Sequence, residues 1–373
     1  MPLSSAITAA IEPLGDIVTL ENDWRALETR ADASFFLSWD WAATAIAMAQ
    51  GDLLVVRVAD ADGVIALGLL SPMREARHGV MRVPQLRLNE DGPHTNATLV
   101  AEGNGLLAAR GMETPAWDAF LSALDGPGAP MWDEIVVSNA FPALEEKTRG
   151  AGRRVHRRAE RGSAYVDLAG LREKGTRTAA DYAATLGKST RSQLIRSLKL
   201  YEARGRLTVD RAQTPAEADA YVDDMATLYS AKWRARGVND PAKSDYLWRF
   251  HRKLINRLRE KNGVELARLS AGGAPFAFVY NFIHGDDVLF NMGGFAVEVD
   301  NRLKPGLVAH ALLIADHVRA GRARYDFLAG DDRYKFNLGQ QGADYVDFAI
   351  QRATPMLQLE SALRAVKRRL VKS

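Results

Sequence analysis

The chain has 373 residues, of which 47% are hydrophobic and 25% charged, so it is long enough for two globular domains and too apolar for a disordered protein. Its formal net charge of +3 is small for this length, so any anion-binding role must rest on local clusters of basic residues. The absence of cysteine excludes disulfides, thiolate nucleophiles and cysteine-ligated zinc sites.

The first half reads as helices followed by strands. Residues 1–16 lack the basic start and long apolar core of a signal peptide, and no apolar run reaches the roughly 18 residues of a membrane span, which predicts a cytoplasmic protein. The aromatic-rich segment 22–48 predicts helices. After it we expect a hairpin of 53–59 and 64–73, a strand at 80–88, a helix at 115–124 and a strand at 134–139. The polar segment 88–104 predicts a loop of the kind that often lines sites.

Residues 147–161 contain seven lysines and arginines and one acid. The lack of interleaved aromatics favours a solvated connector between domains over a nucleic-acid surface, and no motif indicates DNA binding. The alternative is that residues 153–158 clamp a phosphorylated regulator such as a cyclic dinucleotide. The basic tail with Arg364, Lys367, Arg368, Arg369 and Lys372 is a second place for such a regulator, or an amphipathic helix that meets anionic lipid at the membrane surface.

The second half repeats the order of the first. We expect a strand at 163–168, helices at 179–204, 214–233 and 244–260, and an antiparallel meander of 264–270, 276–283 and 288–292. A helix beginning near Pro305 and a strand at 325–328 follow. The architectural similarity of the halves divides the chain into an N-terminal domain (1–160), a C-terminal domain (161–352) and a basic tail (353–373).

The stretch 288–337 carries the sharpest local pattern, because a strand ending in Gly293 and Gly294 leads through a loop into a helix. Pro305 suits the first helical turn, and Gly306 allows the backbone to approach a ligand closely. The N–H groups of a helix start attract anions, and Arg302 and Lys304 add full charges there. A phosphate site and an ordinary strand-loop-helix crossover both fit this pattern.

Two other kinds of site are disfavoured. The seven histidines do not have metal-ligand spacing, because His310 and His317 lie seven residues apart on one predicted helix. No metal is therefore expected, and we expect both histidines at core or surface positions. Residues 187–190 imitate the end of a phosphate-binding loop, but Tyr182 stands where that motif needs its first glycine.

Residues 300–339, above all the motif at 326–335, resemble the acetyltransferases linked to bacterial cellulose and exopolysaccharide synthesis, which are similar to FemAB peptidyltransferases. Segments 35–41, 69–73, 188–205 and 231–237 also resemble that family, so the likeness spans most of the chain. The resemblance implies an α/β protein of two tandem GNAT-like (acyl-CoA N-acyltransferase) domains, each a mixed, mainly antiparallel sheet flanked by helices.

The same resemblance implies an N-acyltransferase that uses acetyl-CoA as co-substrate and needs no metal. Its acceptor would be an amino sugar or lipid-linked sugar, a precursor of an exopolysaccharide of cellulose or holdfast type. Arg302, Lys304 and Gly306 match the family's usual CoA loop only loosely. A longer acyl-CoA and a FemAB-like aminoacyl-tRNA therefore stay open as donors, and so does a catalytically idle regulator that binds a cyclic dinucleotide.

Acyl transfer needs donors for the carbonyl oxygen and groups that move protons. We expect the backbone of Met292, Gly293 and Gly294 to meet the acyl group, and Arg302, Lys304, Gly306 and Leu307 to bind CoA. The candidate catalytic residues are Asp331 as base or as the group that positions the acceptor, Tyr334 as proton donor to the leaving group and Lys335 as the group that holds a phosphate or sugar carboxylate. The alternatives are a helix N-cap for Asp331, a packing role for Tyr334 and a surface salt bridge for Lys335.

Overall fold

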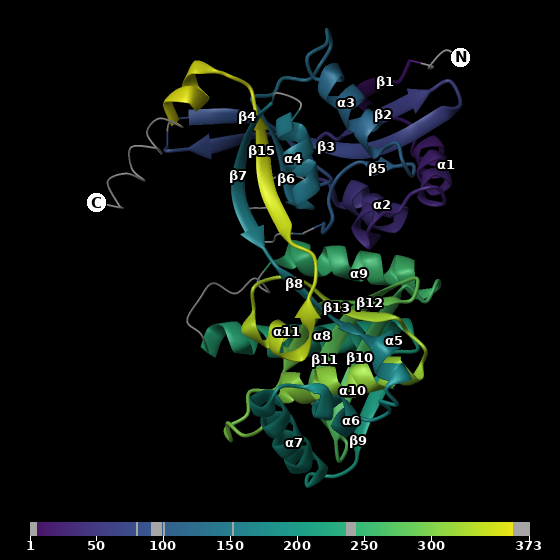
Figure 1. Cartoon of the computed structure of the whole chain (residues 1–373), viewed down its shortest axis with the longest axis vertical. Coiled ribbons are helices and arrows are strands. Elements are labelled where there is room, and N and C mark those ends of the chain that lie inside the picture. The colour runs from purple at the N-terminus through teal and green to yellow at the C-terminus, as the bar shows by residue number, and fades with distance from the viewer. Residues whose placement is uncertain are drawn as a thin grey trace. The chain divides into compact units, whose positions relative to one another are not determined.

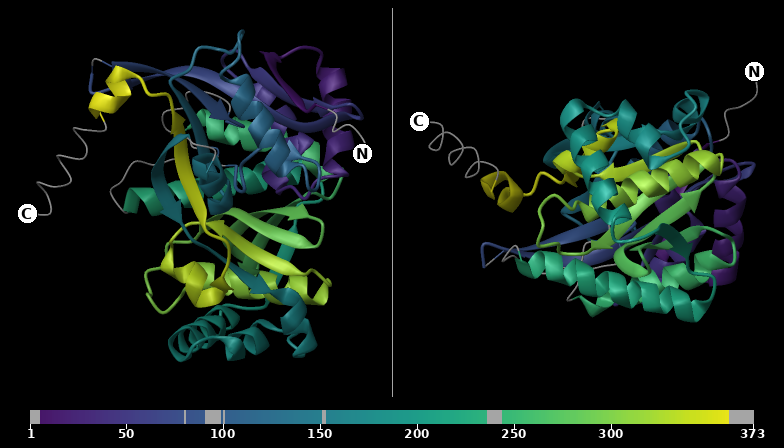
Figure 2. Two further views of the ribbon diagram at one scale, coloured as in Figure 1. Left: turned by 45° about the horizontal axis from the view of Figure 1, so that its top comes forward. Right: turned by 90° about the horizontal axis from the view of Figure 1, so that it is seen from below.

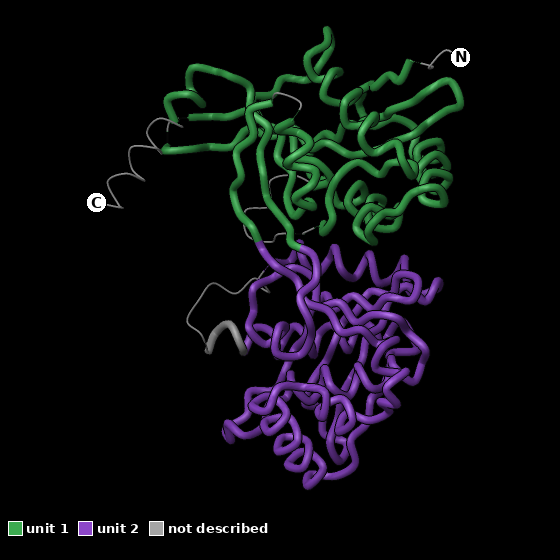
Figure 3. The backbone as a smooth tube through the Cα atoms, in the orientation of Figure 1, with its two compact units in different colours: residues 1–160, 344–373 green, residues 161–343 purple. Residues whose placement is uncertain are grey.

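The computed structural model describes residues 6–79, 81–90, 99, 101–150, 153–235 and 244–360. The chain divides into two compact units (Figure 3), here called unit 1 (1–160 and 344–373) and unit 2 (161–343). The division expected from the sequence puts residues 344–352 in the second domain. They belong to unit 1 because the strand Tyr345–Gln351 (β15) pairs with Glu134–Ala140 (β6).

Unit 1 is a mixed sheet in the order β1-β2-β3-β4-β6-β15-β7, with β5 paired to β3 (Figure 1). In this sheet β4 and β6 pair in parallel, whereas β1–β2, β2–β3, β3–β4 and β6–β15 are antiparallel pairs. Its further elements are β1 (Thr8–Pro13), α1 (Ile17–Glu28), η1 (Phe35–Leu37), α2 (Trp39–Met48), β2 (Leu54–Asp60), β3 (Gly63–Arg77), β4 (Met81–Leu88), β5 (Leu107–Ala108), α3 (Glu113–Ala123), α4 (Pro142–Gly150) and β7 (Arg154–Arg161).

The basic segment is mostly strand β7 rather than a solvated connector. Arg153 forms an ion pair with Asp125 at 2.6 Å, and Arg158 forms one with Glu134 at 2.8 Å. Arg157 pairs with Glu145, which is itself buried. These arginines neutralise carboxylates of unit 1, so an anionic regulator at 153–158 would have to compete with their ion pairs.

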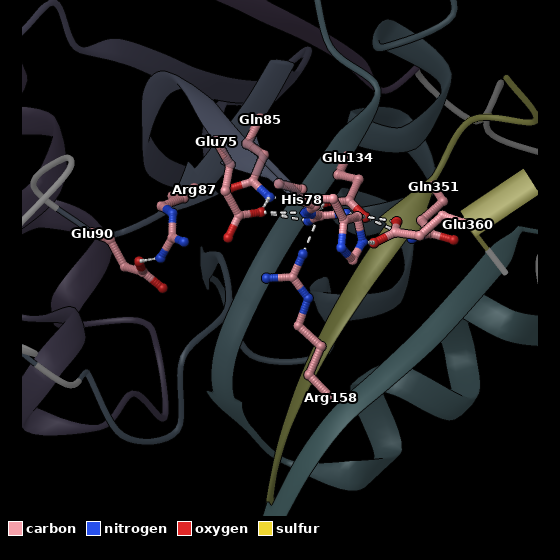
Figure 4. Close-up of polar contacts among 10 residues, drawn as sticks. Glu75, His78, Gln85, Arg87, Glu90, Glu134, Arg158, Gln351 and Glu360 are labelled. Carbon is pink, nitrogen blue, oxygen red and sulfur yellow. Dashed lines mark hydrogen bonds and ion pairs between the residues drawn. The ribbon is translucent and has the colours of Figure 1, made fainter. Parts of the chain in front are cut away.

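A buried charge network, here the Glu134 cluster (Glu75, Arg77, Gln85, Glu134, Arg158, Gln351 and Glu360), joins strands of the unit 1 sheet (Figure 4). The side chain of Glu134 is 0% exposed and accepts hydrogen bonds from Arg77, Gln85, Arg158 and Gln351. Burial alone would raise the pKa of Glu134, but hydrogen bonds from Arg77 and Gln351 and the Arg158 charge lower it to about 2. Glu134 is therefore ionised, and its buried charge depends on these donors.

Unit 2 is a second mixed sheet, in the order β14-β8-β13-β12-β11-β10-β9. It confirms the predicted meander, since β10, β11 and β12 pair antiparallel along the chain. Its elements are β8 (Ser163–Asp167), α5 (Leu168–Glu173), α6 (Ala179–Thr185), α7 (Lys188–Glu202), β9 (Leu207–Arg211), α8 (Pro215–Ala235), α9 (Asp245–Arg259), β10 (Val264–Ala271), β11 (Ala274–His284), β12 (Asp287–Phe295), α10 (Pro305–Arg319), β13 (Arg324–Ala329), α11 (Arg333–Leu338) and β14 (Gln340–Gln341).

Helices cover both faces of the unit 2 sheet. The helix α10 packs with α5, α6 and α7 on one face, whereas α8 and α9 lie on the other; Figure 2 shows this order from two further directions. The predicted helix at 179–204 is two helices, because Leu186 is extended after α6 and Gly187 is the non-helical N-cap of α7. Within the described part of the chain no helix is long and apolar enough to cross a membrane.

Candidate functional site

Two neighbouring strands of unit 2 separate beside α10. β12 and β13 pair in parallel only through residues 287–289 and 324–326, and beyond Leu289 the two strands part. β13 then bulges against β8 between Asp326 and Ala329. Aromatic rings fill the opening: Phe290 and Phe295 from β12, Phe327 from β13, and Tyr334 from α11 surround the imidazole of His310.

The turn after β13 holds its backbone in an unusual conformation. Leu328 has a φ of 59° and Gly330 a φ of 136°, which lie in the region that L side chains rarely adopt. The Asp326 carboxylate accepts a hydrogen bond from the Leu328 N–H at 2.8 Å. The buried Lys335 ammonium donates to the carbonyls of Leu328 (3.2 Å) and Ala329 (2.7 Å). The structure thus gives the buried Lys335 a positioning task under this turn. The ligand contact expected from the sequence stays a prediction.

We therefore predict that Lys335→Met lowers the free energy of unfolding by about 2 kcal/mol, because the Leu328 and Ala329 carbonyls lose a charged donor. Chemical unfolding of the full chain measures the change. Lys199→Met is the control, since Lys199 is exposed on α7, and it should leave stability within about 0.5 kcal/mol. An unchanged unfolding free energy in Lys335→Met would return Lys335 to the ligand-binding role.

The start of α10 presents unsatisfied backbone donors. Pro305 occupies the first turn, and no described side chain caps the helix. The Lys304 N–H donates to the Ser197 hydroxyl at 2.8 Å, which fixes the helix start against α7. The N–H groups of Gly306 and Leu307 lie in the first turn, where a helix has no internal acceptors, so this end attracts an anion.

A pocket of about 380 Å³ opens at this helix start, here called the α10 pocket. It is lined by Thr190 and Gln193 of α7, Phe295 of β12, residues 304–307 and His310 at and within α10, and Tyr334, Asn337 and Leu338 of α11. Its wall is mostly apolar, with the helix start and a few polar groups facing in, which is the usual make-up of a small-molecule site.

His310 is the polar group that sequence reasoning missed. It is 1% exposed, its Nδ1 lies 3.1 Å from the Tyr325 hydroxyl, and its Nε2 has no hydrogen-bond partner in the described structure. Burial, together with the charge of Lys335, lowers the pKa of His310 to about 3, so the imidazole is neutral. The available signal was its spacing, because His310 stands one helical turn after Gly306 and shares a face with it.

Four of the predicted site residues line the α10 pocket: Lys304, Gly306, Leu307 and Tyr334. Tyr334 stacks on His310 with 5.9 Å between ring centroids, and burial raises its pKa, so its hydroxyl keeps its proton at neutral pH.

The other predicted residues lie elsewhere. Met292, Gly293 and Gly294 pair with β11, and a Cβ on Gly294 would come within 2.5 Å of the Met225 carbonyl oxygen, so close packing of α8 requires that glycine. Arg302 pairs with Asp300 at 2.7 Å. Asp331 is exposed and accepts from the Gly162 N–H at 3.0 Å, while Asp332 occupies the N-cap position of α11.

Some predictions concern residues outside the described ranges. They are residue 80 of a predicted strand, residues 91–98 and 100 of the predicted site loop, residues 151–152 of the basic segment, residues 236–237, and residues 361–373 of the basic tail. At the edges of the loop, the Asn89 amide donates to Asn104 at 3.0 Å.

Among the residues that the structure describes, no group of three or more His, Asp or Glu is placed to hold a metal ion.

Comparison with known proteins supports the fold. Residues 188–336 match a family model described as an acetyltransferase (GNAT) domain. The solved structure of FemX is 12% identical and has a TM-score of 0.58, covering 93% of this chain and 99% of its own. The C-terminal domain of a putative lysylphosphatidylglycerol synthetase from Agrobacterium fabrum is 14% identical and has a TM-score of 0.50, covering 95% and 97%. No curated protein matches the sequence.

A conserved protein of unknown function from Bacteroides thetaiotaomicron has a similar fold, with 11% identity and a TM-score of 0.56 over 92% of this chain and 100% of its own. At these identities the likeness concerns the fold alone. The predicted α/β fold of two mixed sheets flanked by helices, with a GNAT domain in the second half, is confirmed.

Proposed function

We propose that this protein is an N-acyltransferase that transfers an acyl group, most simply acetyl, from an acyl-CoA thioester to an amine in the α10 pocket. The observation that carries the proposal is the position of this pocket, at an uncapped helix start beside the opening between β12 and β13. The first-turn N–H groups and Lys304 suit a diphosphate, and the apolar wall suits the acyl arm.

The pocket residues have different roles in the proposed acyl transfer. The amine nitrogen attacks the thioester carbon, the carbon–sulfur bond breaks with its electron pair on sulfur, and one proton passes from nitrogen to sulfur overall. The Tyr334 hydroxyl, at the pocket wall and protonated at neutral pH, is the proposed donor to the departing thiolate. Asp331 and Lys335 act at a distance, by holding Gly162 and the turn after β13.

The proposed acceptor is an amino sugar or lipid-linked sugar of exopolysaccharide synthesis. This finer assignment rests on the resemblance of residues 300–339 to that family. A second hollow of about 340 Å³ supports it, because it shares Asn337 and Leu338 with the α10 pocket and carries Asp167 and Lys174. These side chains can hydrogen-bond sugar hydroxyls.

Calorimetric titration with acetyl-CoA tests the proposal. We expect the wild type to bind, and Lys304→Ala to bind about tenfold more weakly, a loss of about 1.4 kcal/mol, because one charge leaves the phosphate site. Lys253→Ala, an exposed lysine of α9 outside the pocket, should bind like the wild type.

Absence of binding at millimolar acetyl-CoA would overturn the proposal. If the protein then bound aminoacyl-tRNA, it would instead be a FemAB-like transferase, the donor class that the sequence left open. Equal losses in Lys304→Ala and Lys253→Ala would show a diffuse electrostatic effect and would remove the diphosphate from the α10 helix start.

A further inference from the structure

A chain of buried polar side chains crosses the core of unit 2 and ends at the α10 pocket. Glu265 on β10 is 7% exposed and accepts from the Asn281 amide on β11 at 2.6 Å. Burial raises the pKa of the Tyr325 hydroxyl, the Asn281 amide opposes this as a donor on that side, and the hydroxyl lies 3.1 Å from His310 Nδ1. The chain ends at His310 Nε2, for which the described structure shows no partner.

The carboxylate fixes the direction of every hydrogen bond in this chain. Burial would raise the pKa of Glu265, but His317 and Arg211 lower it to about 2, so Glu265 is ionised and can only accept. The Asn281 NH₂ must therefore face Glu265, because the flipped amide would set its oxygen against the carboxylate. The second N–H of that amide is then the group available on the side of the Tyr325 oxygen.

With the Asn281 N–H on the side of its oxygen, the Tyr325 hydroxyl directs its own proton at His310 Nδ1, the hydrogen-bond partner that the structure gives it. A neutral imidazole that accepts at Nδ1 carries its hydrogen on Nε2. The Glu265 carboxylate thus orders the protons so that the hydrogen lies on Nε2 of His310, a residue that lines the α10 pocket. The surrounding rings of Phe290, Phe327 and Tyr334 hold the imidazole in place.

We propose that His310 is a catalytic residue whose Nε2–H donates a hydrogen bond to the carbonyl oxygen of the bound thioester. This assignment rests on the proposed function. When the amine attacks, the π electrons of the carbonyl move onto oxygen, and the N–H stabilises the charge that develops there. When the intermediate collapses, the carbonyl re-forms and the carbon–sulfur bond breaks. His310 keeps its proton throughout, and a neutral imidazole with a low pKa suits this task.

Isotope-edited infrared spectroscopy of the complex with acetyl-CoA labelled with ¹³C at the carbonyl tests the hydrogen bond. A donor at the oxygen weakens the C=O bond, so we expect the carbonyl band at lower wavenumber in the wild-type complex than in the His310→Phe complex. Tyr325→Phe, which keeps the imidazole but removes the group that orders its protons, should give an intermediate band. Affinity should stay within about threefold, because the interaction strengthens only as charge develops.

The control is His251→Phe, because His251 is likewise buried and neutral but lies on α9 outside the pocket. Its complex should keep the wild-type band. Coincident bands in the wild type, His310→Phe and Tyr325→Phe would overturn the role of His310 while leaving the proposed function standing. If His310→Phe does not fold, the Tyr325→Phe band decides. A wild type that binds no acetyl-CoA would overturn the proposed function and this role with it.

Discussion

Glu134→Ala is expected to lower the free energy of unfolding of unit 1 by about 3–5 kcal/mol. The substitution leaves the guanidinium groups of Arg77 and Arg158 in the sheet without the buried carboxylate that both of them contact. Urea unfolding followed by tryptophan fluorescence is the measurement. Five of the seven tryptophans, at positions 24, 39, 41, 117 and 132, lie in unit 1, so the signal reports mainly on that unit.

Glu160→Ala is the matched control for this prediction. Glu160 also contacts an arginine, Arg157, at 2.8 Å, but its side chain is 55% exposed. An exposed ion pair contributes roughly 0–1 kcal/mol, so the control should change stability little. If the two variants lost the same stability, the Glu134 cluster would not be the structural centre of the unit 1 sheet.

The same carboxylate predicts a pH dependence. The pKa of Glu134 is about 2 in the folded protein, below the ordinary value of 4.5, so folding favours the ionised form. This stabilisation is complete above pH 4.5 and is lost as the pH falls toward 2. Glu134→Gln removes the titrating group, so its stability should fall less steeply across that window than that of the wild type. Parallel curves for the two proteins would contradict the assignment.

Gly306→Leu is expected to abolish acetyl-CoA binding, with affinity falling by at least about 100-fold, while the fold stays intact. A Cβ on Gly306 would lie 3.7 Å from the Phe295 ring, an ordinary contact, and both residues line the α10 pocket. A leucine side chain built from that position enters the space that the ligand needs. Replacing a helical glycine also favours the helix by about 0.5–1 kcal/mol.

Calorimetry and thermal unfolding of Gly306→Leu test the two parts of this prediction together. Gly306→Ala is the matched control, since it makes the same backbone change with little added volume and should retain most of the binding. Wild-type affinity in Gly306→Leu would remove the ligand from the α10 pocket. Loss of the cooperative thermal transition in Gly306→Leu would contradict the prediction that the pocket has room for the added side chain and that the fold stays intact.

The sequence predicted those features that depend on neighbouring residues. Pro305 and Gly306 marked the start of α10, and the turns at 271–274 and 284–287 marked the meander, because each depends on local backbone preferences. For the same reason Lys304, Gly306, Leu307 and Tyr334 were found as pocket residues from one contiguous stretch of chain.

The features that sequence reasoning missed depend on partners far along the chain. The proposed position of the hydrogen on the His310 ring depends on Tyr325, 15 residues away, and through it on Asn281 and Glu265 on other strands. The sequence predicts a connector at Arg158 because its partner Glu134 is 24 residues away on another strand. The position of β15 depends on its pairing with β6, about 200 residues earlier in the chain. The pattern of neighbouring residues in the sequence does not predict such long-range contacts.

The most direct measurement of the central claim is a crystal structure of the full chain with acetyl-CoA. We predict that the diphosphate lies against the N–H groups of Gly306 and Leu307, and that the thioester oxygen lies about 3 Å from His310 Nε2. Acetyl-CoA bound elsewhere in the protein, with the α10 pocket empty at saturating ligand, would contradict the account.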